Sequence, residues 1–296
     1  MTDNRQEQFF DDLAWALNSP NLLIAAPPEF TGEIVDEQLR SHLFSNCYID
    51  TALEFKQQRL GLYFESLISY AIQHNNDLCL LARNLAIFEE KRQLGEFDLI
   101  FQDKIHQVNH HWELAVKFYL FDPASTQWVG PNARDRLDIK LNKLFTQQLL
   151  RQQHPCAQKF LSPLLHDAPL QSAAFIKGYL FYPWHMQASI SLPNWINPNH
   201  LKGWWCFQHE ITECFKEKEA SRWAIIPRLQ WLSPLTAKED DALISTQELV
   251  TAIETHFKLY SSSPLIAELC QNNTHWQEVS RGFVVPNQWP MKRMAH

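Results

Sequence analysis

The chain has 296 residues, of which 45% are hydrophobic and 20% charged, an ordinary composition for a folded globular protein. Its net charge of −7 argues against a protein coated in nucleic acid, and no apolar run approaches the roughly 20 residues that cross a bilayer. The polar N-terminus does not read as a secretory signal, and the 6 cysteines show no paired spacing. We therefore expect a soluble, cytoplasmic protein with reduced thiols.

The first part of the chain predicts helices followed by strands. We expect an N-terminal helix over residues 6–17 and then a loop through Pro27 and Pro28. Apolar residues recur at three- and four-residue intervals over residues 53–74 and predict a second helix. Turn-forming residues follow it. Aromatic and β-branched residues then predict three strands, over residues 84–89, 96–101 and 111–120.

A loop leads to a further predicted helix over residues 134–152 and a strand over residues 174–183. Helix, three strands, helix and strand in this order indicate an α/β fold. The remaining residues predict an α+β extension with a strand at 223–229, a helix at 246–259 and a strand at 282–285. We therefore expect three parts: an N-terminal helical segment, a core, and an extension or second domain, over residues 1–52, 53–184 and 185–296.

Asp98 lies within the second predicted strand of the core. Because side chains alternate between the faces of a strand, Glu96, Asp98 and Ile100 share one face. The other face is apolar, with Phe97, Leu99 and Phe101. A carboxylate among apolar strands is costly unless something binds it or that face is open to solvent.

Further charged residues lie in the third strand and in the helix before the strands. Glu113 and Lys117 share one strand face, where they could also form a simple salt bridge on a solvated surface. Glu65 borders the buried stripe of its helix and could lean over the sheet. The sequence therefore predicts one polar site that gathers Glu65, Asp98, Glu113 and Lys117.

These segments resemble the PD-(D/E)XK nuclease superfamily, whose core has the same order of elements. The resembling stretches are 59–65, 95–101 and 111–120. The resemblance implies a restriction-endonuclease-like core, with Asp98 as the metal-binding aspartate and Glu65 as the first-helix glutamate. The whole chain also resembles a bacterial family of unknown function in its stretches 130–131, 202–205 and 281–286.

The third strand departs from the nuclease pattern, which has an acid and a lysine two residues apart. Here Glu113 and Lys117 are separated by four positions, with Ala115 between them. Four residues of extended strand span about 13 Å, so either a bulge brings the two together or one has moved from its usual place. This departure leaves open a site that binds without cutting.

The resemblance implies Mg²⁺ or Mn²⁺ held by Glu65, Asp98 and Glu113. Asp98, Glu113 and Lys117 would be the catalytic residues, with Lys117 orienting the attacking water. Nucleic-acid phosphates would contact the start of the second core helix through Arg134, Arg136, Lys140 and Lys143. The loop before this helix, residues 130–132, would offer free N–H groups to an anion.

The sequence thus predicts metal-dependent phosphodiester hydrolysis of nucleic acid, DNA rather than RNA. One alternative is a module on the same fold that binds nucleic acid or protein without catalysis. Another is an α/β protein whose charged residues form ion pairs on a solvated face.

Overall fold

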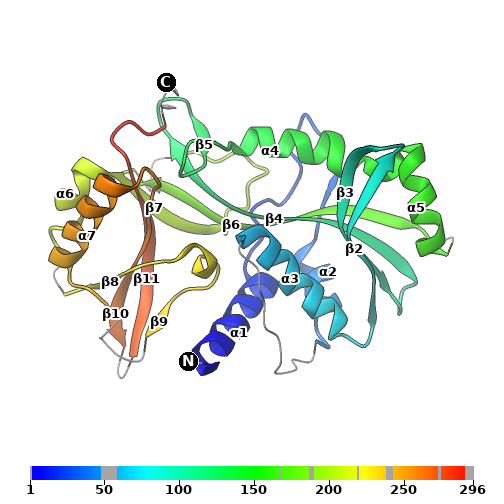
Figure 1. The fold of residues 1–296 in the computed structure, drawn as a ribbon, viewed down its shortest axis with the longest axis horizontal. Coiled ribbons are helices and arrows are strands. Elements are labelled where there is room, and N and C mark those ends of the chain that lie inside the picture. Colours follow the sequence, from blue (N-terminus) through cyan, green and yellow to red (C-terminus); the bar gives the residue numbers. More distant parts are fainter. Residues whose placement is uncertain are drawn as a thin grey trace. The chain divides into compact units, whose positions relative to one another are not determined.

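The computed structural model shows a mixed α/β fold (Figure 1). It divides into two compact units, and β4 (Val108–Asp122) and β6 (Leu170–Pro183) each pass from the first unit into the second. The first unit comprises Met1–Lys117, Lys140–Gly178 and Leu192–His200, and the second comprises Phe118–Ile139, Tyr179–Ser191 and Leu201–His296. The predicted domain boundaries after residues 52 and 184 stay predictions. The structure describes residues 2–47, 59–166, 168–186, 190–218, 220–237, 243–272 and 275–290.

The first unit contains the predicted strands of the core, each longer than the sequence indicated. They lie in the order β2-β3-β4-β6-β1, with β2, β3 and β4 antiparallel and β1 parallel to β6. Here β1 spans Glu33–Ile34, β2 spans Leu78–Glu89 and β3 spans Arg92–Asp103. Consecutive antiparallel strands need only tight turns, which matches the short polar links in the sequence.

Helices cover both faces of these strands. On one face Phe64 of α3 stacks on Phe175 of β6, and Phe175 stacks on Trp112 of β4. On the other face Ala157 and Leu161 of α5 form a buried cluster with strand residues. The helices of this unit are α1 (Thr2–Asn18), α2 (Glu37–Leu43), α3 (Leu60–Gln73) and α5 (Pro155–Leu165). The helices predicted at 6–17 and 53–74 are confirmed, although residues 53–58 lie outside the described part of the chain.

The helix predicted over residues 134–152 is confirmed in part, but it is shorter and irregular. It consists of α4 (Leu137–Lys143), which continues into a π-helical turn (Leu144–Gln148), and a 3₁₀ turn (Arg151–Gln153) follows. Pro155 then starts α5, because proline suits the first position of a helix. The loop that precedes α4 closes on itself, because the Gly130 N–H donates to the Asp135 carbonyl at 2.7 Å. The sequence had predicted free N–H groups for an anion in this loop, but the Gly130 N–H is already used.

The alternation predicted for the strand around Asp98 also fails. Phe97 and Ile100, three positions apart, belong to the same buried cluster against α5. Phe101 instead contacts Trp112 on the face that α3 covers, with ring centroids 5.0 Å apart. The neighbouring strand is irregular here, since Asn84 has a positive φ of 50°. A local distortion of this kind turns side chains to a different face of the sheet. The two-residue alternation of a regular strand does not predict it.

The second unit is also a mixed sheet with helices. Its strands run in the order β6-β7-β11-β10-β8, with β7 parallel to both neighbours and the later pairs antiparallel; β5 pairs with β4 and β9 with β11. Helices α6 and α7 pack on these strands around Trp204 and Trp223 (Figure 1). Further elements are β5 (Gln127–Val129), β7 (Leu201–Phe207), α6 (Ile211–Phe215), β8 (Arg222–Ile225), β9 (Thr236–Ala237), α7 (Thr246–Leu259), β10 (Leu265–Asn272) and β11 (His275–Val285).

Two of the three elements predicted in this region are confirmed. The predicted helix at 246–259 is α7, and the predicted strand at 282–285 is the end of β11. The strand predicted at 223–229 stops at Ile225, because Pro227 leads into a 3₁₀ turn. None of the described helices is long and apolar enough to cross a membrane.

Candidate carboxylate–lysine site

Asp98 lies where β3 and β4 part in the first unit. The paired residues of the two strands run up to Leu99 opposite Trp112. At the next position the Asp98 carboxylate accepts a hydrogen bond from the Leu114 N–H, at 2.9 Å. A side-chain oxygen thus takes a place that a backbone carbonyl fills in a regular ladder, so the carboxylate is held between the strands.

The surroundings of Asp98 favour its protonated form. The pKa of Asp98 is raised to about 8, first by burial and then by the charges of Glu113 and Glu65, while the Leu114 N–H and Lys140 oppose the rise. A carboxyl group with so high a pKa is neutral at pH 7, because placing a second and third negative charge in a poorly hydrated site is unfavourable.

Glu65 reaches the same site from α3. The pKa of Glu65 is raised to about 7, mainly by burial and also by the charges of Glu96 and Glu113, while Arg83 and a hydrogen bond with Asn84 oppose the rise. The structure therefore brings Glu65, Asp98 and Glu113 close enough for their charges to interact, as the sequence predicted. Two carboxyl groups that resist ionisation side by side are a common feature of sites that bind cations or move protons.

Glu113 differs from the other two acids because its oxygens already have donors. Its side chain is 1% exposed, and Oε1 lies 2.9 Å from Arg151 Nη1 and 3.1 Å from His111 Nε2. Oε2 accepts a short hydrogen bond from the Gln148 amide. Ser172 Oγ lies 2.8 Å from the other nitrogen of His111 and holds that ring in place. Glu113 is thus a fixed negative charge within a complete hydrogen-bond network.

Arg151 is held over the strand that carries Asp98. Its Nη1 donates to the Glu96 carbonyl at 2.5 Å, and its guanidinium carbon lies 5.7 Å from the centre of the Phe97 ring. A Cβ at position 95 would come within 2.7 Å of the guanidinium, so this placement depends on Gly95. Glycine at that position also suits its φ of 152°.

Lys140 lies at this site, and the charge of Lys117 acts on Lys140. Lys140 of α4 donates to the Gln148 Oε1 at 2.9 Å, and Gln148 in turn donates to Glu113. Burial lowers the pKa of Lys140 and Lys117 lowers it further, whereas Glu113 and Asp98 raise it. Lys117 lies on β4, where a Cβ at position 178 would meet its carbonyl oxygen at 1.7 Å. Gly178 is therefore needed for β6 to pass β4 at this point.

The other basic residues chosen from the sequence do not converge in the same way. Arg136 is exposed and paired with Asp138 at 2.5 Å, and Arg134 is exposed in the loop before α4. Both belong to the second unit. Lys143 is exposed on α4 in the first unit, one turn from Lys140. Of the four predicted phosphate contacts, Lys140 is therefore the residue that the structure places at the carboxylates.

His111, Gln148 and Arg151 are parts of the site that the sequence analysis missed. His111 could have been found, because it lies two positions before Glu113 and so on the same strand face. Gln148 lies in the π-helical turn and Arg151 in the 3₁₀ turn, so no regular helical period relates them to the strands. Their contacts with Glu113 join residues 35 and 38 positions apart and depend on tertiary packing.

The donor atoms decide which cation would suit this site. Among the residues that the structure describes, no group of three or more His, Cys, Asp or Glu side chains could hold a metal ion together. Mg²⁺ commonly uses one or two carboxylates and completes its shell with waters and phosphate oxygens. Glu65 and Asp98 fit that arrangement, whereas Glu113 would first have to exchange one of its present donors.

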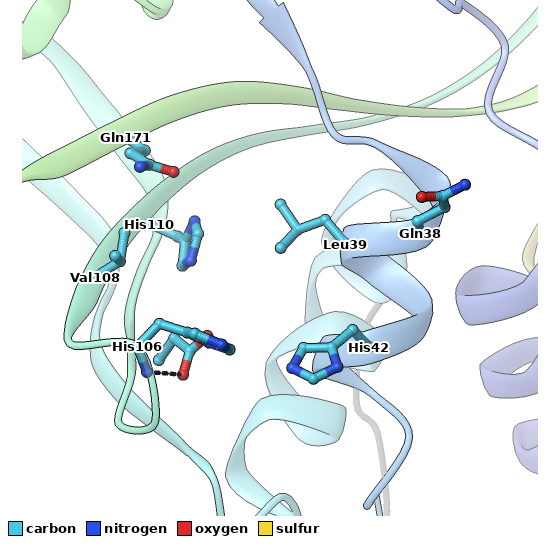
Figure 2. A pocket seen from close by; sticks show the side chains of 8 residues that line it. Gln38, Leu39, His42, His106, Val108, His110 and Gln171 are labelled. Atoms are coloured by element: carbon cyan, nitrogen blue, oxygen red, sulfur yellow. Dashed lines mark hydrogen bonds and ion pairs between the residues drawn. The ribbon is translucent and has the colours of Figure 1, made fainter.

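A separate hollow in the first unit is lined by histidines (Figure 2). His42 of α2 and His106 of the β3–β4 turn point toward each other, with ring centroids 5.4 Å apart. Asp103 accepts from the His106 ring at 2.7 Å, and burial lowers the pKa of His110 beside them. The hollow is also lined by Gln38, Leu39, Val108 and Gln171. The finding on metal groups applies to these histidines as it does to the carboxylates. The raised pKa values of Glu65 and Asp98 distinguish the carboxylate site.

The fold and this cluster define a mixed α/β protein with an acidic, half-buried polar site. The chain belongs to the family described as "Domain of unknown function (DUF1853)", whose model matches residues 11–285. The predicted membership of a family of unknown function is thereby confirmed. No curated protein and no solved structure matches the chain.

Proposed function

We propose that this protein hydrolyses phosphodiester bonds of nucleic acid, DNA rather than RNA, with a divalent cation held at Glu65 and Asp98. The observation that carries the proposal is the pair of half-buried carboxyl groups with raised pKa values, to about 7 and about 8, beside a lysine. Burial without enough donors is unfavourable for such a pair, and a cation would relieve it.

A bound Mg²⁺ or Mn²⁺ would polarise a phosphate oxygen and lower the pKa of a coordinated water. The residues of the chain have the remaining roles. Asp98 is fixed by the Leu114 N–H and would keep its second oxygen for the cation. Glu113 would act as a fixed charge or as a further ligand, and Lys117 and Lys140 would offset the negative charge that develops on phosphate.

The arrangement of elements supports a restriction-endonuclease-like core as part of this proposal. Helix α3 is followed by three antiparallel strands, and the chain returns through α4 and α5 to β6, which lies beside β4. Asp98 and Glu113 lie on adjacent strands where these part.

The test is cleavage of labelled single- and double-stranded DNA and RNA with Mg²⁺ or Mn²⁺. We expect cutting by the wild type and a loss of at least about 100-fold in Asp98→Asn, because a ligand is removed while the Leu114 N–H keeps its acceptor. Asp138→Asn is the matched control, since Asp138 is an exposed carboxylate paired with Arg136. Cutting that survives in Asp98→Asn would contradict the proposal.

One observation favours a second function, a module on this fold that binds phosphates without catalysis. Glu113 already accepts hydrogen bonds from Arg151, Gln148 and His111, so it does not stand ready as a metal ligand. Under this alternative the wild type would bind oligonucleotides without cutting them, and binding would not require a divalent cation.

A further inference from the structure

Lys140 stands out among the cations of the first unit, because it is tied into the carboxylate site by a chain of side chains. Its Nζ donates to Gln148 at 2.9 Å, and Gln148 donates to Glu113. An ammonium group has three N–H bonds. In the part of the chain that the structure describes, one of them is used by Gln148, which leaves donors for a phosphate oxygen.

The turn that carries Gln148 is unusual and explains how it reaches both partners. The Leu149 N–H donates to the Leu144 carbonyl, five residues back, at 3.0 Å, which widens the helix after Lys143. Turns of this π-helical kind are rare and occur often at functional sites. Here the wide turn places one amide between the ammonium of Lys140 and the carboxylate of Glu113.

The charges agree with this geometry. Lys140 is the cation whose charge lowers the pKa of Asp98, against the effects of burial and of Glu113. Asp98 and Glu113 in turn raise the pKa of Lys140 against its burial. Lys117 acts on Lys140 as a like charge. An anion beside Lys140 would therefore meet a positive group that is already held at the carboxylates.

We infer that Lys140, rather than Lys117, binds the substrate phosphate at this site, and that Gln148 holds Lys140 in position. The inference rests on the proposed function for the identity of the substrate. Of the four basic residues that the sequence had assigned to phosphates, it keeps Lys140 and assigns its positioning to the wide turn after α4. Lys117 then contributes through its charge and its place in β4.

The test is the affinity of the full chain for a fluorescent DNA oligonucleotide, measured by anisotropy with Ca²⁺ in place of Mg²⁺ or Mn²⁺. We expect Lys140→Gln to weaken binding at least tenfold and to reduce the salt dependence by about one phosphate contact. Lys117→Gln should weaken it by no more than about threefold, because Lys117 would make no direct contact with the phosphate. Lys104→Gln is the control, because Lys104 is an exposed lysine in the turn between β3 and β4.

The outcomes separate the inference from the proposed function. Equal losses in Lys140→Gln and Lys117→Gln, a larger loss in Lys117→Gln, or no binding by the wild type would overturn the inference. Metal-dependent cutting by the wild type would leave the proposed function standing in the first two cases. Binding that depends on Lys140 without any cutting would retain the inference and reject hydrolysis.

A second variant guards against misfolding of Lys140→Gln. Gln148→Ala keeps the ammonium but removes its anchor, so we expect a loss of about three- to tenfold in affinity with unchanged salt dependence. Lys140→Arg keeps the charge and should retain binding within about threefold. An affinity that is unchanged in Gln148→Ala would overturn the positioning role.

Discussion

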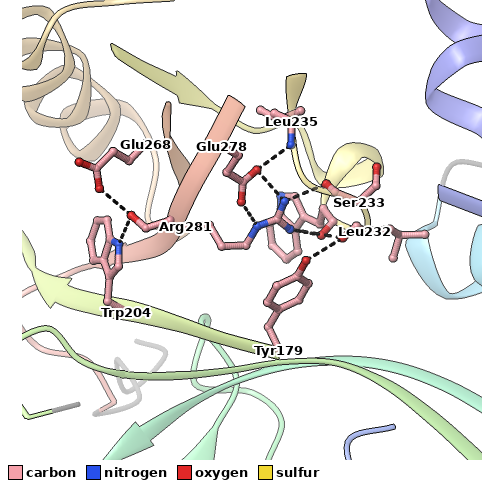
Figure 3. Close-up of polar contacts among 10 residues, drawn as sticks. Tyr179, Trp204, Leu232, Ser233, Leu235, Glu268, Glu278 and Arg281 are labelled. Atoms are coloured by element: carbon pink, nitrogen blue, oxygen red, sulfur yellow. Dashed lines mark hydrogen bonds and ion pairs between the residues drawn. The ribbon is translucent and has the colours of Figure 1, made fainter. Parts of the chain in front are cut away.

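Each unit contains buried carboxylates, and their surroundings differ. In the second unit Glu268, labelled in Figure 3, accepts hydrogen bonds from Lys218, Ser221 and Ser280, the last two at 2.8 and 2.7 Å. Burial raises the pKa of Glu268, but these donors outweigh it and hold the pKa below its usual value. In the first unit Asp98 has one backbone donor and two acidic neighbours, and its pKa is raised to about 8.

The comparison shows how a structural acid can be told from a candidate functional one. A carboxylate that serves packing alone is surrounded by enough donors to be stable as an ion. Glu65 and Asp98 are half-buried without that compensation, which is unfavourable for folding and points to a cation or proton as the missing partner. The predictions below test this difference.

The largest effect is expected at the ionic cluster of the second unit. Arg281 is 2% exposed and donates to the carbonyls of Trp231 and Ser233 and to Glu278 (Figure 3). Arg281→Met would leave a buried carboxylate without its cation, so we expect a loss of about 3–5 kcal/mol in the free energy of unfolding. Urea denaturation measures it.

Arg228→Met is the control for that variant, because Arg228 is exposed and lies only over the Trp231 ring, at 5.7 Å. Its loss should stay below about 1 kcal/mol. A similar loss in both variants would show that the Arg281 cluster is not the structural centre described here.

A smaller loss is expected where β6 passes β4 at the carboxylate site. In Gly178→Ala the new Cβ would lie 1.7 Å from the Lys117 carbonyl, at a φ of 137°. The strands would have to separate, and we expect a cost of about 2–4 kcal/mol, measured by urea denaturation. Gly61→Ala is the control, because a Cβ added at position 61 would meet no atom within 4 Å and alanine favours a helix. A stable Gly178→Ala protein would contradict the close approach.

The most direct contrast pairs Asp98→Asn with Glu268→Gln. The pKa of Asp98 is raised from 3.8 to about 8, so its contribution to stability is present below pH 4 and is lost as the pH rises toward 8. At pH 9 we expect Asp98→Asn to be more stable than the wild type by about 1–3 kcal/mol. Glu268→Gln should be less stable by about 1–2 kcal/mol above pH 5, because it loses charge-assisted hydrogen bonds.

Chemical denaturation across pH 5 to 9 checks both variants. A destabilising effect of Asp98→Asn at pH 9 as large as that of Glu268→Gln would mean that the two acids have the same structural role. The difference between the two units would then disappear.

The smallest effect concerns Lys177, a buried lysine outside both clusters. Its pKa is lowered to about 6, mainly by burial and also by Arg40, and its Nζ donates to the Ser19 carbonyl. Its folded pKa lies below the unfolded value of 10.5, so stability increases with pH between about 6 and 10. Lys177→Met should remove that slope and change stability by no more than about 1 kcal/mol at pH 8. Thermal unfolding of the wild type and of Lys177→Met at pH 6, 8 and 9.5 would measure this dependence of stability on pH. The same dependence in both proteins would contradict a neutral Lys177.

The sequence predicted those elements that local patterns determine. The apolar stripe over 60–73 and the aromatic and β-branched runs of β2, β3 and β4 gave the correct types of element, and all three acids of the site lie together. The errors arose where tertiary contacts decide. The wide turn after Lys143, the start of α5 at Pro155 and the distortion near Asn84 have no periodic signal.

The same limit applies to the site. Glu113 was expected to be a metal ligand, and its sequence neighbours did not show that Gln148 and Arg151 would supply its donors. Lys140 was expected as one phosphate contact among four on a long helix, whereas its half-buried place beside Gln148 follows from the break in that helix.

The measurement that tests the account most directly is calorimetric titration of the full chain with Mn²⁺ at pH 7, in two buffers of different ionisation heat. The account predicts binding coupled to the release of protons, because Glu65 and Asp98 have pKa values of about 7 and about 8 and must ionise to hold the cation. Both the binding and the proton release should be lost in Asp98→Asn and retained in Asp138→Asn. No Mn²⁺ binding, or binding that Asp98→Asn leaves unchanged, would contradict the assignment of this carboxylate pair as a cation site.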